Sequence, residues 1–170
     1  MRGARIIGTG RALPPRVVKN EELTRRMDTS DEWIVQRTGV RERRYVEPGT
    51  GSSHLGAEAA RKAIANAGIT VDDIDLIVFA TLSPDHVFPG NGVLVQEQLG
   101  MRTVGALDVR DQCTGFVYGL SVAEAYVKGG FHDHVLVIGA EVQSTGLDFS
   151  TKGRDVAVIF GDGAGAVVVG

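Results

Sequence analysis

The chain has 170 residues, of which 43% are hydrophobic and 23% charged, and its formal net charge is −3 at pH 7. This length can bury one sizeable core, and the slightly acidic balance argues against nucleic acid or an anionic membrane as the main partner. The single cysteine excludes an internal disulfide and fits a reducing compartment.

No targeting or membrane-spanning segment is recognisable in the sequence. The start, MRGARIIGTG, lacks the long apolar core and small-residue cleavage site of a secretory signal. Apolar runs such as LIVFA and AVVVG fall far short of the ~20 residues that cross a bilayer. We therefore expect a cytoplasmic, globular α/β protein.

The first part of the chain predicts one strand and three helices. The segment RERRYVEPGTG is charged and rich in turn residues, so we expect a surface loop there. The predicted elements are a strand over 4–10, a short helix from Asn20, a helix from Ser30 that stops at Gly39, and a helix that Ser53 caps and that runs through Ala67 to Gly68.

The second part alternates apolar strands with helices. Near-continuous apolar runs at 74–81, 106–109 and 134–141 predict strands buried in a parallel sheet, with helices over 93–100 and 113–128 between them. The segment VAVIFGDGAGAVVVG (156–170) predicts two strands around a GDGAG turn, hence an antiparallel hairpin. This order indicates a mostly parallel sheet covered by helices on both faces.

The sequence stops at Gly170, directly after an apolar strand. A sheet that ended there would leave a face or an edge uncovered. We therefore expect the chain to be part of a larger fold.

Cys113 lies where a predicted strand passes into a predicted helix, in the segment ALDVRDQCTGFVYGL. The positive end of the helix dipole and unpaired backbone N–H groups stabilise a thiolate, which is the nucleophilic form. Gly115 would let the backbone turn tightly and let a substrate approach. A buried core cysteine fits the same spacing, and so does the nucleophile of a Cys–His hydrolase.

Five segments, in order along nearly the whole chain, resemble the β-ketoacyl-acyl carrier protein synthase III family of thiolase-fold condensing enzymes. The segment around Cys113 resembles that family's nucleophile segment. The five segments are IIGTGRALPPRVVKNEEL, DTSDEWIVQRTGVRERR, ATLSPDHVFPG, DVRDQCTGFVYGLSVAEAYVKGG and VAVIFGDGAGAVVV.

The resemblance implies an α/β, thiolase-like fold built from two similar halves. Residues 1–170 would form the N-terminal, nucleophile-bearing half, and the C-terminal half would be absent from this chain. By analogy, Cys113 takes an acyl group from acyl-coenzyme A, and the acyl group condenses with malonyl-acyl carrier protein with loss of CO2. A histidine and an asparagine of the second half would assist, with no resident cofactor or metal, and fatty-acid or polyketide chains would be initiated.

The resemblance also assigns a coenzyme A site. Trp33 and Arg37 share one face of a predicted helix, and an indole and a guanidinium can hold an adenine by stacking. Arg154 matches the family's second arginine at the adenine, and Thr29 matches a threonine near the nucleotide. The sequence alone favours a Trp33 packed against its own domain and a solvated Arg37, and the family resemblance reverses that preference. Thr29 would equally belong to a helix cap with Ser30.

Phe88 matches the phenylalanine that reaches into the acyl pocket of the partner subunit, which implies a homodimer. Its alternative role is that of a loop residue covering the core.

Three arginines lie close together in the sequence, namely Arg41, Arg43 and Arg44. We expect them to be solvated, or to attract the phosphates of coenzyme A or an acidic carrier protein.

The remaining motifs do not predict a phosphate or metal site. GTG at 8–10 is not followed by a helix, and GDGAG at 161–165 lacks a following Lys-Ser/Thr, so neither is expected to bind phosphate. His132-Asp133-His134 is too short a fragment to predict a metal site. The histidines are expected to be surface or loop residues that match no catalytic histidine of the family, and they are His54, His86, His132 and His134.

The sequence departs from the family pattern at Gln112, at Gln143 and over Gly90–Gly92, which leaves the acyl donor open. A noncatalytic binding or assembly partner and a thioesterase-like hydrolase are the rival functions. A starter acyltransferase of secondary metabolism is a further variant of the condensing role.

Overall fold

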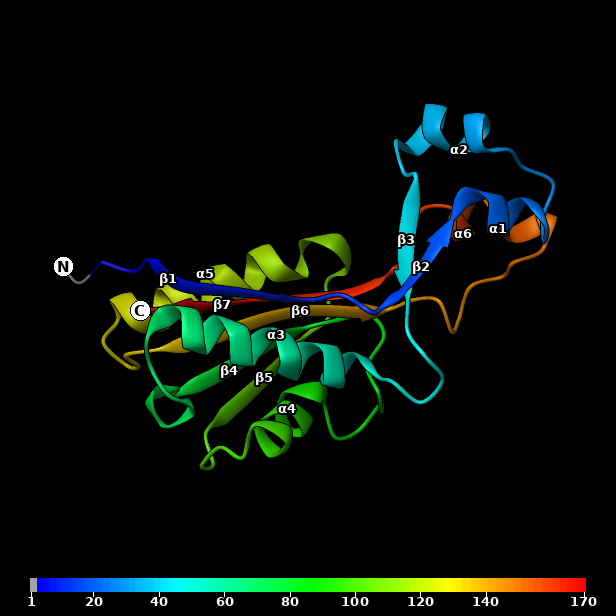
Figure 1. Ribbon diagram of the computed structural model, residues 1–170. Helices are drawn as coiled ribbons and strands as arrows, with labels where there is room; N and C mark the ends of the chain where they lie inside the picture. The colour runs from blue at the N-terminus through cyan, green and yellow to red at the C-terminus, as the bar shows by residue number, and fades with distance from the viewer. Residues whose placement is uncertain (1–2) are drawn as a thin grey trace. The chain divides into compact units, whose positions relative to one another are not determined.

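The computed structural model describes residues 3–170, which fold as two compact units (Figure 1). The sheet unit contains the described residues up to Ala12 together with Thr50–Glu141 and Gly163–Gly170. The small unit contains Leu13–Gly49 and Val142–Asp162.

A five-stranded sheet forms the centre of the sheet unit, in the order β1-β7-β6-β4-β5. Strand β4 runs parallel to both β5 and β6, with Val78 opposite Leu107 and Val137, whereas β1 runs antiparallel to β7. The strands are β1 (Ile6–Ala12), β4 (Leu76–Ala80), β5 (Gly105–Val109), β6 (Val135–Val142) and β7 (Asp162–Val169).

Helices cover both faces of this sheet, as expected. Neighbouring residues of a strand point to opposite faces: Phe79 of β4 contacts the helix that carries Gly56, and Val78 lies against the helix that carries Gly119. The first helix is therefore on the opposite face from the second (Figure 1). The helices of the unit are α3 (Ser52–Ala67), α4 (Asn91–Leu99) and α5 (Gly115–Lys128), with 3-10 turns η1 (Val71–Asp73) and η2 (Gln112–Thr114).

The apolar stripe of α5 packs as its spacing predicts. Ala123 and Val127 are fully buried against the sheet, and Phe116 and Leu120 pack partly buried beside them. Burial of such side chains contributes roughly 1.5–3 kcal/mol each relative to exposure. The sheet residues in this cluster are Leu76, Val78, Val135, Val137, Val167 and Val169.

The small unit is built on a two-stranded antiparallel sheet of β2 (Arg16–Lys19) and β3 (Glu42–Tyr45). Ser30 caps α2 by accepting a hydrogen bond from the Trp33 backbone N–H (3.1 Å), and Gly39 ends it with φ +73°, as the sequence predicts. The remaining elements are α1 (Asn20–Thr24), α2 (Asp31–Thr38), η3 (Thr151–Gly153) and α6 (Arg154–Ala157).

The expected surface loop at RERRYVEPGTG is wrong in its first half, because β3 occupies it. Arg43 is only 6% exposed and donates hydrogen bonds to the Val18 and Val158 carbonyl oxygens (3.5 and 3.2 Å), so it is no solvated cluster residue. Burial lowers the pKa of the Arg43 guanidinium from its ordinary value, and the charge of Tyr45 opposes that change.

The expected hairpin over 156–170 is also wrong. Residues Arg154–Ala157 are helical, and GDGAG enters a single strand, β7, which lies between β6 and β1 and pairs antiparallel with β1 at the other end of the chain. Gly161 allows close packing, since a Cβ there would lie 2.9 Å from that of Arg43. Antiparallel pairing is present, but it joins segments that are distant in sequence.

Two local expectations need correction. Strand 106–109 is not buried, because β5 lies at the edge of the sheet and Leu107 is 42% exposed. Ser53 does not cap α3, since the helix starts at Ser52 after Gly51. Both serines are buried and bind the carboxylate of Asp85 instead.

Strand β1 and helix α3 approach closely because two β1 residues lack a side chain. A Cβ atom on Gly10 would collide with the carbonyl oxygen of Ala59 and lie 2.5 Å from the Ala63 nitrogen. A Cβ on Gly8 would lie 2.6 Å from that of Ala67. The small residues on both sides set this distance.

Gly10→Ala should lower the free energy of unfolding by about 1–3 kcal/mol, because the methyl group overpacks the contact between β1 and α3. Urea unfolding measures the change. The matched control is Gly165→Ala on the neighbouring strand, where a Cβ would have nothing within 4 Å. Equal destabilisation by the two substitutions would contradict this packing.

Candidate active site

Cys113 is exposed on the turn η2, which joins the end of β5 to the start of α5. The backbone N–H and the hydroxyl of Thr114 both donate to the Asp111 carbonyl oxygen (3.1 and 2.9 Å), which closes the turn. The thiol thus lies at the carboxyl-terminal edge of the parallel strands, where ligands bind in open α/β sheets. The alternative of a buried core cysteine does not hold for this structure.

The backbone next to the thiol is strained on one side and close-packed on the other. Gln112 has φ +40°, a left-handed conformation that costs a residue with a Cβ on the order of 1–2 kcal/mol. Gly115 is buried, and a Cβ there would lie 3.3 Å from that of Ala80. This close approach lets α5 begin directly against the end of β4, which leaves Cys113 outside.

A cleft of about 290 Å³ opens at the same edge of the sheet. The loop after β4 forms one wall and the end of β5 forms the other. Its lining residues are Thr81, Pro84, His86, Val87, Gly90, Asp108, Val109 and Arg110.

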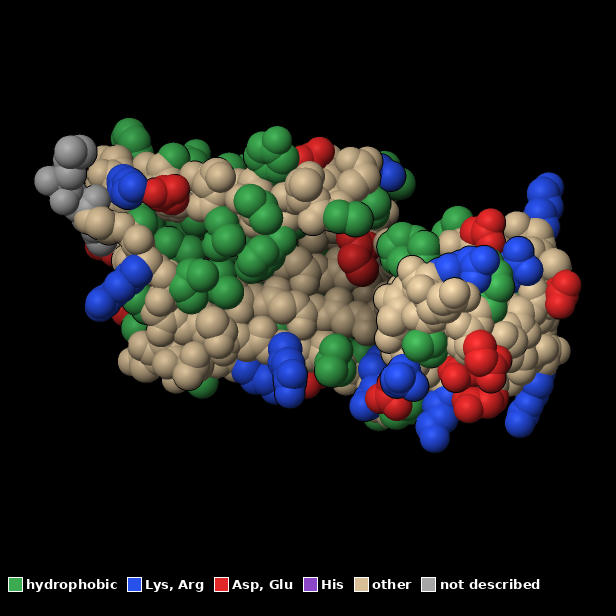
Figure 2. All heavy atoms as spheres, turned by 90° about the horizontal axis from the view of Figure 1, so that it is seen from above, with side chains coloured by type: hydrophobic (Ala, Val, Ile, Leu, Met, Phe, Trp, Pro, Cys, Tyr) green, Lys and Arg blue, Asp and Glu red, His purple; other side chains and the backbone are tan. Residues whose placement is uncertain are grey.

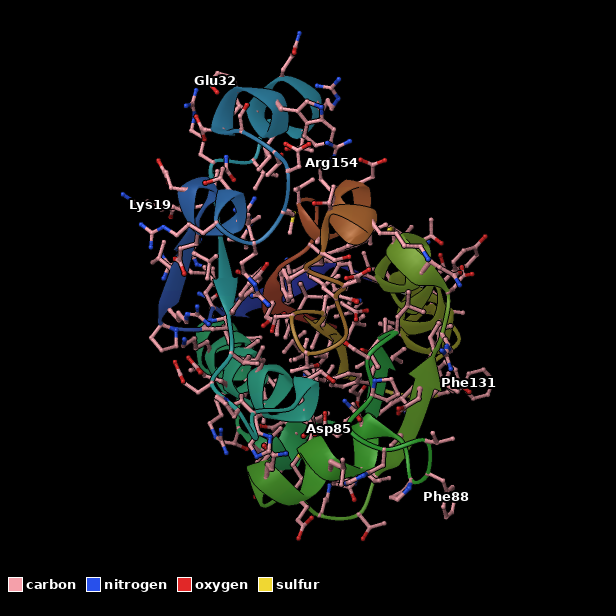
Figure 3. All side chains as sticks on the ribbon, turned by 90° about the vertical axis from the view of Figure 1, so that its right-hand side faces the viewer. Lys19, Glu32, Asp85, Phe88, Phe131 and Arg154 are labelled. Carbon is pink, nitrogen blue, oxygen red and sulfur yellow. The ribbon has the colours of Figure 1, made fainter. Side chains whose placement is uncertain are left out.

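Asp85 ties this loop to the start of α3. Its carboxylate accepts hydrogen bonds from the Ser53 backbone N–H (3.1 Å), from the Ser53 hydroxyl (2.5 Å) and from the Ser52 hydroxyl (3.1 Å). Figure 3 shows Asp85 directed into the region between α3 and α4. Burial raises the pKa of the Asp85 carboxyl, and the hydrogen bonds from Ser53, Ser52 and Asn91 outweigh that effect and lower it overall.

Phe88 is 89% exposed and its neighbour Val87 is fully exposed, at the tip of the same loop. Figure 3 shows Phe88 projecting outward. Phe88 therefore covers no part of the core of the sheet unit.

In the small unit, two guanidinium groups lie over the ring of Trp33. The Cζ atoms of Arg37 and Arg154 are 4.3 and 4.4 Å from the ring centroid. Arg154 also donates to the Asp28 carbonyl oxygen (2.9 Å) and pairs with Asp155 (3.3 Å). The structure thus brings together three side chains that the family resemblance assigned to one site.

A cleft of about 300 Å³ adjoins the Trp33 ring and is lined by Trp33, Arg37, Thr38, Asp155, Val158 and Ile159. Thr29 precedes the helix cap, and its hydroxyl is buried with no hydrogen-bond partner within residues 3–170. Ser30 is the capping residue, so the cap does not use the Thr29 hydroxyl.

The histidines have local roles. The ring of His132 stacks on Tyr126 (5.0 Å between centroids), and His134 Nδ1 lies 3.0 Å from the Asp73 carbonyl oxygen. Within residues 3–170, no three His, Cys, Asp or Glu side chains lie together as a metal ion would require.

Sequence reasoning missed the aspartates that hold the loops. Asp162, inside GDGAG, is 5% exposed and accepts from the backbone N–H groups of Val46 (2.8 Å), Gln143 (2.8 Å) and Ser144 (2.9 Å). A buried aspartate flanked by glycines indicates a carboxylate that holds several loops, because the glycines leave room for several backbone segments around it.

Residues 107–170, which include Cys113, match the family model described as 3-oxoacyl-[acyl-carrier-protein (ACP)] synthase III. The β-ketoacyl-[acyl-carrier-protein] synthase III of Rhizorhabdus wittichii is 53% identical over 169 residues, which cover 99% of this chain and 52% of that protein. The chain belongs to this family.

Solved structures agree with this membership. The 3-oxoacyl-[acyl-carrier-protein] synthase III of Aquifex aeolicus has a TM-score of 0.94 and 45% identity, covering 98% of this chain and 53% of the other. The priming β-ketosynthase of the R1128 polyketide pathway has a TM-score of 0.94 and 37% identity, covering 99% and 50%. The fold is thus thiolase-like, and the chain spans about half the length of the curated relatives it matches.

The described part of the chain, residues 3–170, contains no helix that is both long and apolar enough to cross a membrane.

Proposed function

We propose that this chain carries the nucleophile of a 3-oxoacyl-acyl carrier protein synthase III. The observation that carries the proposal is the exposed Cys113 on a strained turn at the carboxyl edge of the sheet, in a chain about half identical to enzymes of that name. The Cys113 thiolate attacks the carbonyl carbon of an acyl-coenzyme A. A carbon–sulfur bond forms to Cys113, and the coenzyme A thiolate leaves and takes up a proton.

The second step consumes the enzyme-bound acyl group. Malonyl-acyl carrier protein loses CO2, and the resulting carbanion attacks the Cys113 thioester and releases the thiol. The product is 3-oxoacyl-acyl carrier protein. We assign the histidine and asparagine that would assist decarboxylation to the part of the relatives' length that this chain does not span.

The face of Trp33 is the proposed adenine site. Adenine would stack on the indole in place of one guanidinium, and the other arginine would remain in contact with the base. The adjoining cleft gives room for the nucleotide. Thr29 is assigned to this site by its match to the family pattern alone, since its hydroxyl is buried and Thr29 does not line the cleft. Coenzyme A thioester is a substrate here, and we propose no resident cofactor.

We also propose a cytoplasmic location, because a single cysteine without an internal disulfide fits a compartment that keeps thiols reduced. Cell fractionation tests this location, and recovery of the protein outside the cytoplasm would refute it.

Similarity to a priming β-ketosynthase of a polyketide pathway favours a starter role in secondary metabolism as the second candidate function.

A second copy of the chain is the proposed partner at the β5 edge. Strand β5 ends the sheet with Leu107 42% exposed, and an unpaired edge offers backbone groups to another strand. Phe88 and Val87 lie exposed on the loop beside the cleft. Figure 2 views the sheet unit from the opposite side, toward β1, where further hydrophobic side chains gather.

Two rival functions make different predictions. A noncatalytic assembly partner does not need the exposed thiol or the Trp33 site. A thioesterase-like hydrolase needs a histidine base, and none of the four histidines is recorded in a hydrogen bond with Cys113 within the described chain. Acyl transfer to Cys113 separates the condensing role from both.

Cys113→Ala should abolish the gain of one acyl group on incubation with acetyl-coenzyme A while leaving the fold intact, because the carbon–sulfur bond cannot form. Intact-mass spectrometry measures the gain. Ser121→Ala, which removes an exposed hydroxyl from α5, is the control and should still be acylated. Acylation of the Cys113→Ala variant would refute the mechanism.

Of Arg37→Ala and Arg154→Ala, the variant that removes the arginine still in contact with the base should weaken coenzyme A binding about tenfold, which corresponds to the loss of one partly desolvated cation–π contact. Calorimetry measures the affinity. Arg26→Ala is the matched control, since its guanidinium lies 4.0 Å from the Phe149 ring in the same unit but outside the proposed site. Unchanged affinity in both test variants would reject the adenine site.

Leu107→Lys should convert a dimer to a monomer, because a charge on an edge strand opposes pairing with a second strand. Sedimentation velocity measures the mass. Val93→Lys is the control, as Val93 on α4 has the same exposure within one per cent (43% against 42%). A monomeric wild type, or a Leu107→Lys variant that stays dimeric, would disprove this interface.

A further inference from the structure

The loop over 81–90 is held by carboxylates that come from three different places in the sheet unit. At its start, Glu141 of β6 accepts from the Leu82 backbone N–H (2.7 Å) and the Ser83 hydroxyl (2.5 Å). In its middle, Asp85 binds the first turn of α3. The loop is therefore fixed to elements on both sides of β4.

The end of the loop is held by the third carboxylate. Asp108 of β5 accepts from the backbone N–H groups of Asn91 (2.6 Å) and Gly92 (2.9 Å) at the start of α4. A Cβ on Gly90 would collide with this carboxylate. The glycines over Gly90–Gly92, a departure from the family pattern, therefore make room for Asp108.

Asp85 is the one of these three carboxylates that belongs to the loop itself. Its backbone N–H donates to Asn91 Oδ1 (3.0 Å), and the Asn91 amide in turn donates to Ser52 (2.7 Å). Asn91 and Ser52 are fully buried. Asp85 thus joins the loop to α3 and α4 at one point, and only 86–90 extend beyond it.

The segment 86–90 carries Phe88 and supplies His86, Val87 and Gly90 to the wall of the cleft. Its two ends are held at Asp85 and at Asn91, so the position of this wall depends on the Asp85 carboxylate. A wall displaced by about 1 Å can change a reaction rate on the order of 100-fold.

We infer that Asp85 is a positioning residue that fixes the 86–90 wall and so sets which acyl group the site accepts. This inference rests on the proposed function, because it concerns the acyl donor of the same site. Asp85 touches neither substrate nor Cys113 in this account, and it acts through the loop.

The test compares Asp85→Ala and Asp85→Asn with Asp73→Ala. Asp73 is a matched control because its carboxylate accepts from the Thr70 backbone N–H and hydroxyl (both 2.8 Å) on the turn before β4, at the opposite end of the same strand. Hydrogen exchange reports on the loop. Competition between acetyl- and butyryl-coenzyme A for Cys113, read by intact mass, reports on acyl preference.

In Asp85→Ala, the amides over 82–92 should exchange at least about tenfold faster, because charge-assisted hydrogen bonds are lost. The ratio of acetyl to butyryl transfer should shift about tenfold. Asp85→Asn should give a smaller change in both readouts, and it decides the question if the alanine variant does not fold. Asp73→Ala should change neither.

Unchanged exchange over 82–92 in the Asp85 variants would overturn the positioning role. Faster exchange with an unaltered acyl ratio would overturn the role in specificity. If wild-type Cys113 accepted no acyl group from either donor, the proposed function would fail, and the proposed role of Asp85 in acyl specificity would fail with it. The exchange result would still decide whether Asp85 holds the loop, so the two failures are distinguishable.

Discussion

Carboxylate oxygens replace backbone partners at the edge where the central strands of the sheet end. Strand β4 is buried at every residue from Leu76 to Ala80, and beyond Thr81, whose N–H still donates to the Val109 carbonyl oxygen of β5 (3.2 Å), the chain leaves its neighbouring strand. A buried N–H left without a partner costs about 1–3 kcal/mol. Glu141, Asp85 and Asp108 supply acceptors to the loop and to two helix starts. Asp162 does the same for three backbone amides in the small unit.

This arrangement has a chemical consequence, because a nucleophile works best from a rigid support. The turn of Cys113 follows β5, whose Asp108 holds α4, and it precedes α5, whose first residue packs against Ala80. The thiol is thus exposed while the backbone on either side is fixed. The left-handed conformation of Gln112 is the strain that accompanies this position.

The features that the sequence predicted are those set by local or strongly periodic signals. Ser30, Gly39 and Gly68 mark helix ends because capping depends on neighbouring residues, and the buried strands follow from continuous apolar runs. The pairing of β7 with β1 could not be predicted, because the partner lies at the other end of the chain. Likewise, the buried Arg43 and the half-buried Asp85 depend on carbonyl and hydroxyl groups far along the sequence. The family resemblance grouped Arg37 and Arg154 with Trp33, whereas only the structure shows that both guanidinium groups lie over the indole ring.

A crystal structure of the protein after incubation with an acyl-coenzyme A tests the central claim most directly. The account predicts an acyl group bonded to Cys113 Sγ, and an adenine stacked on Trp33 with one of the two guanidinium groups displaced from the ring. An acyl group on another side chain, or coenzyme A bound away from Trp33 with Cys113 unmodified, would contradict it.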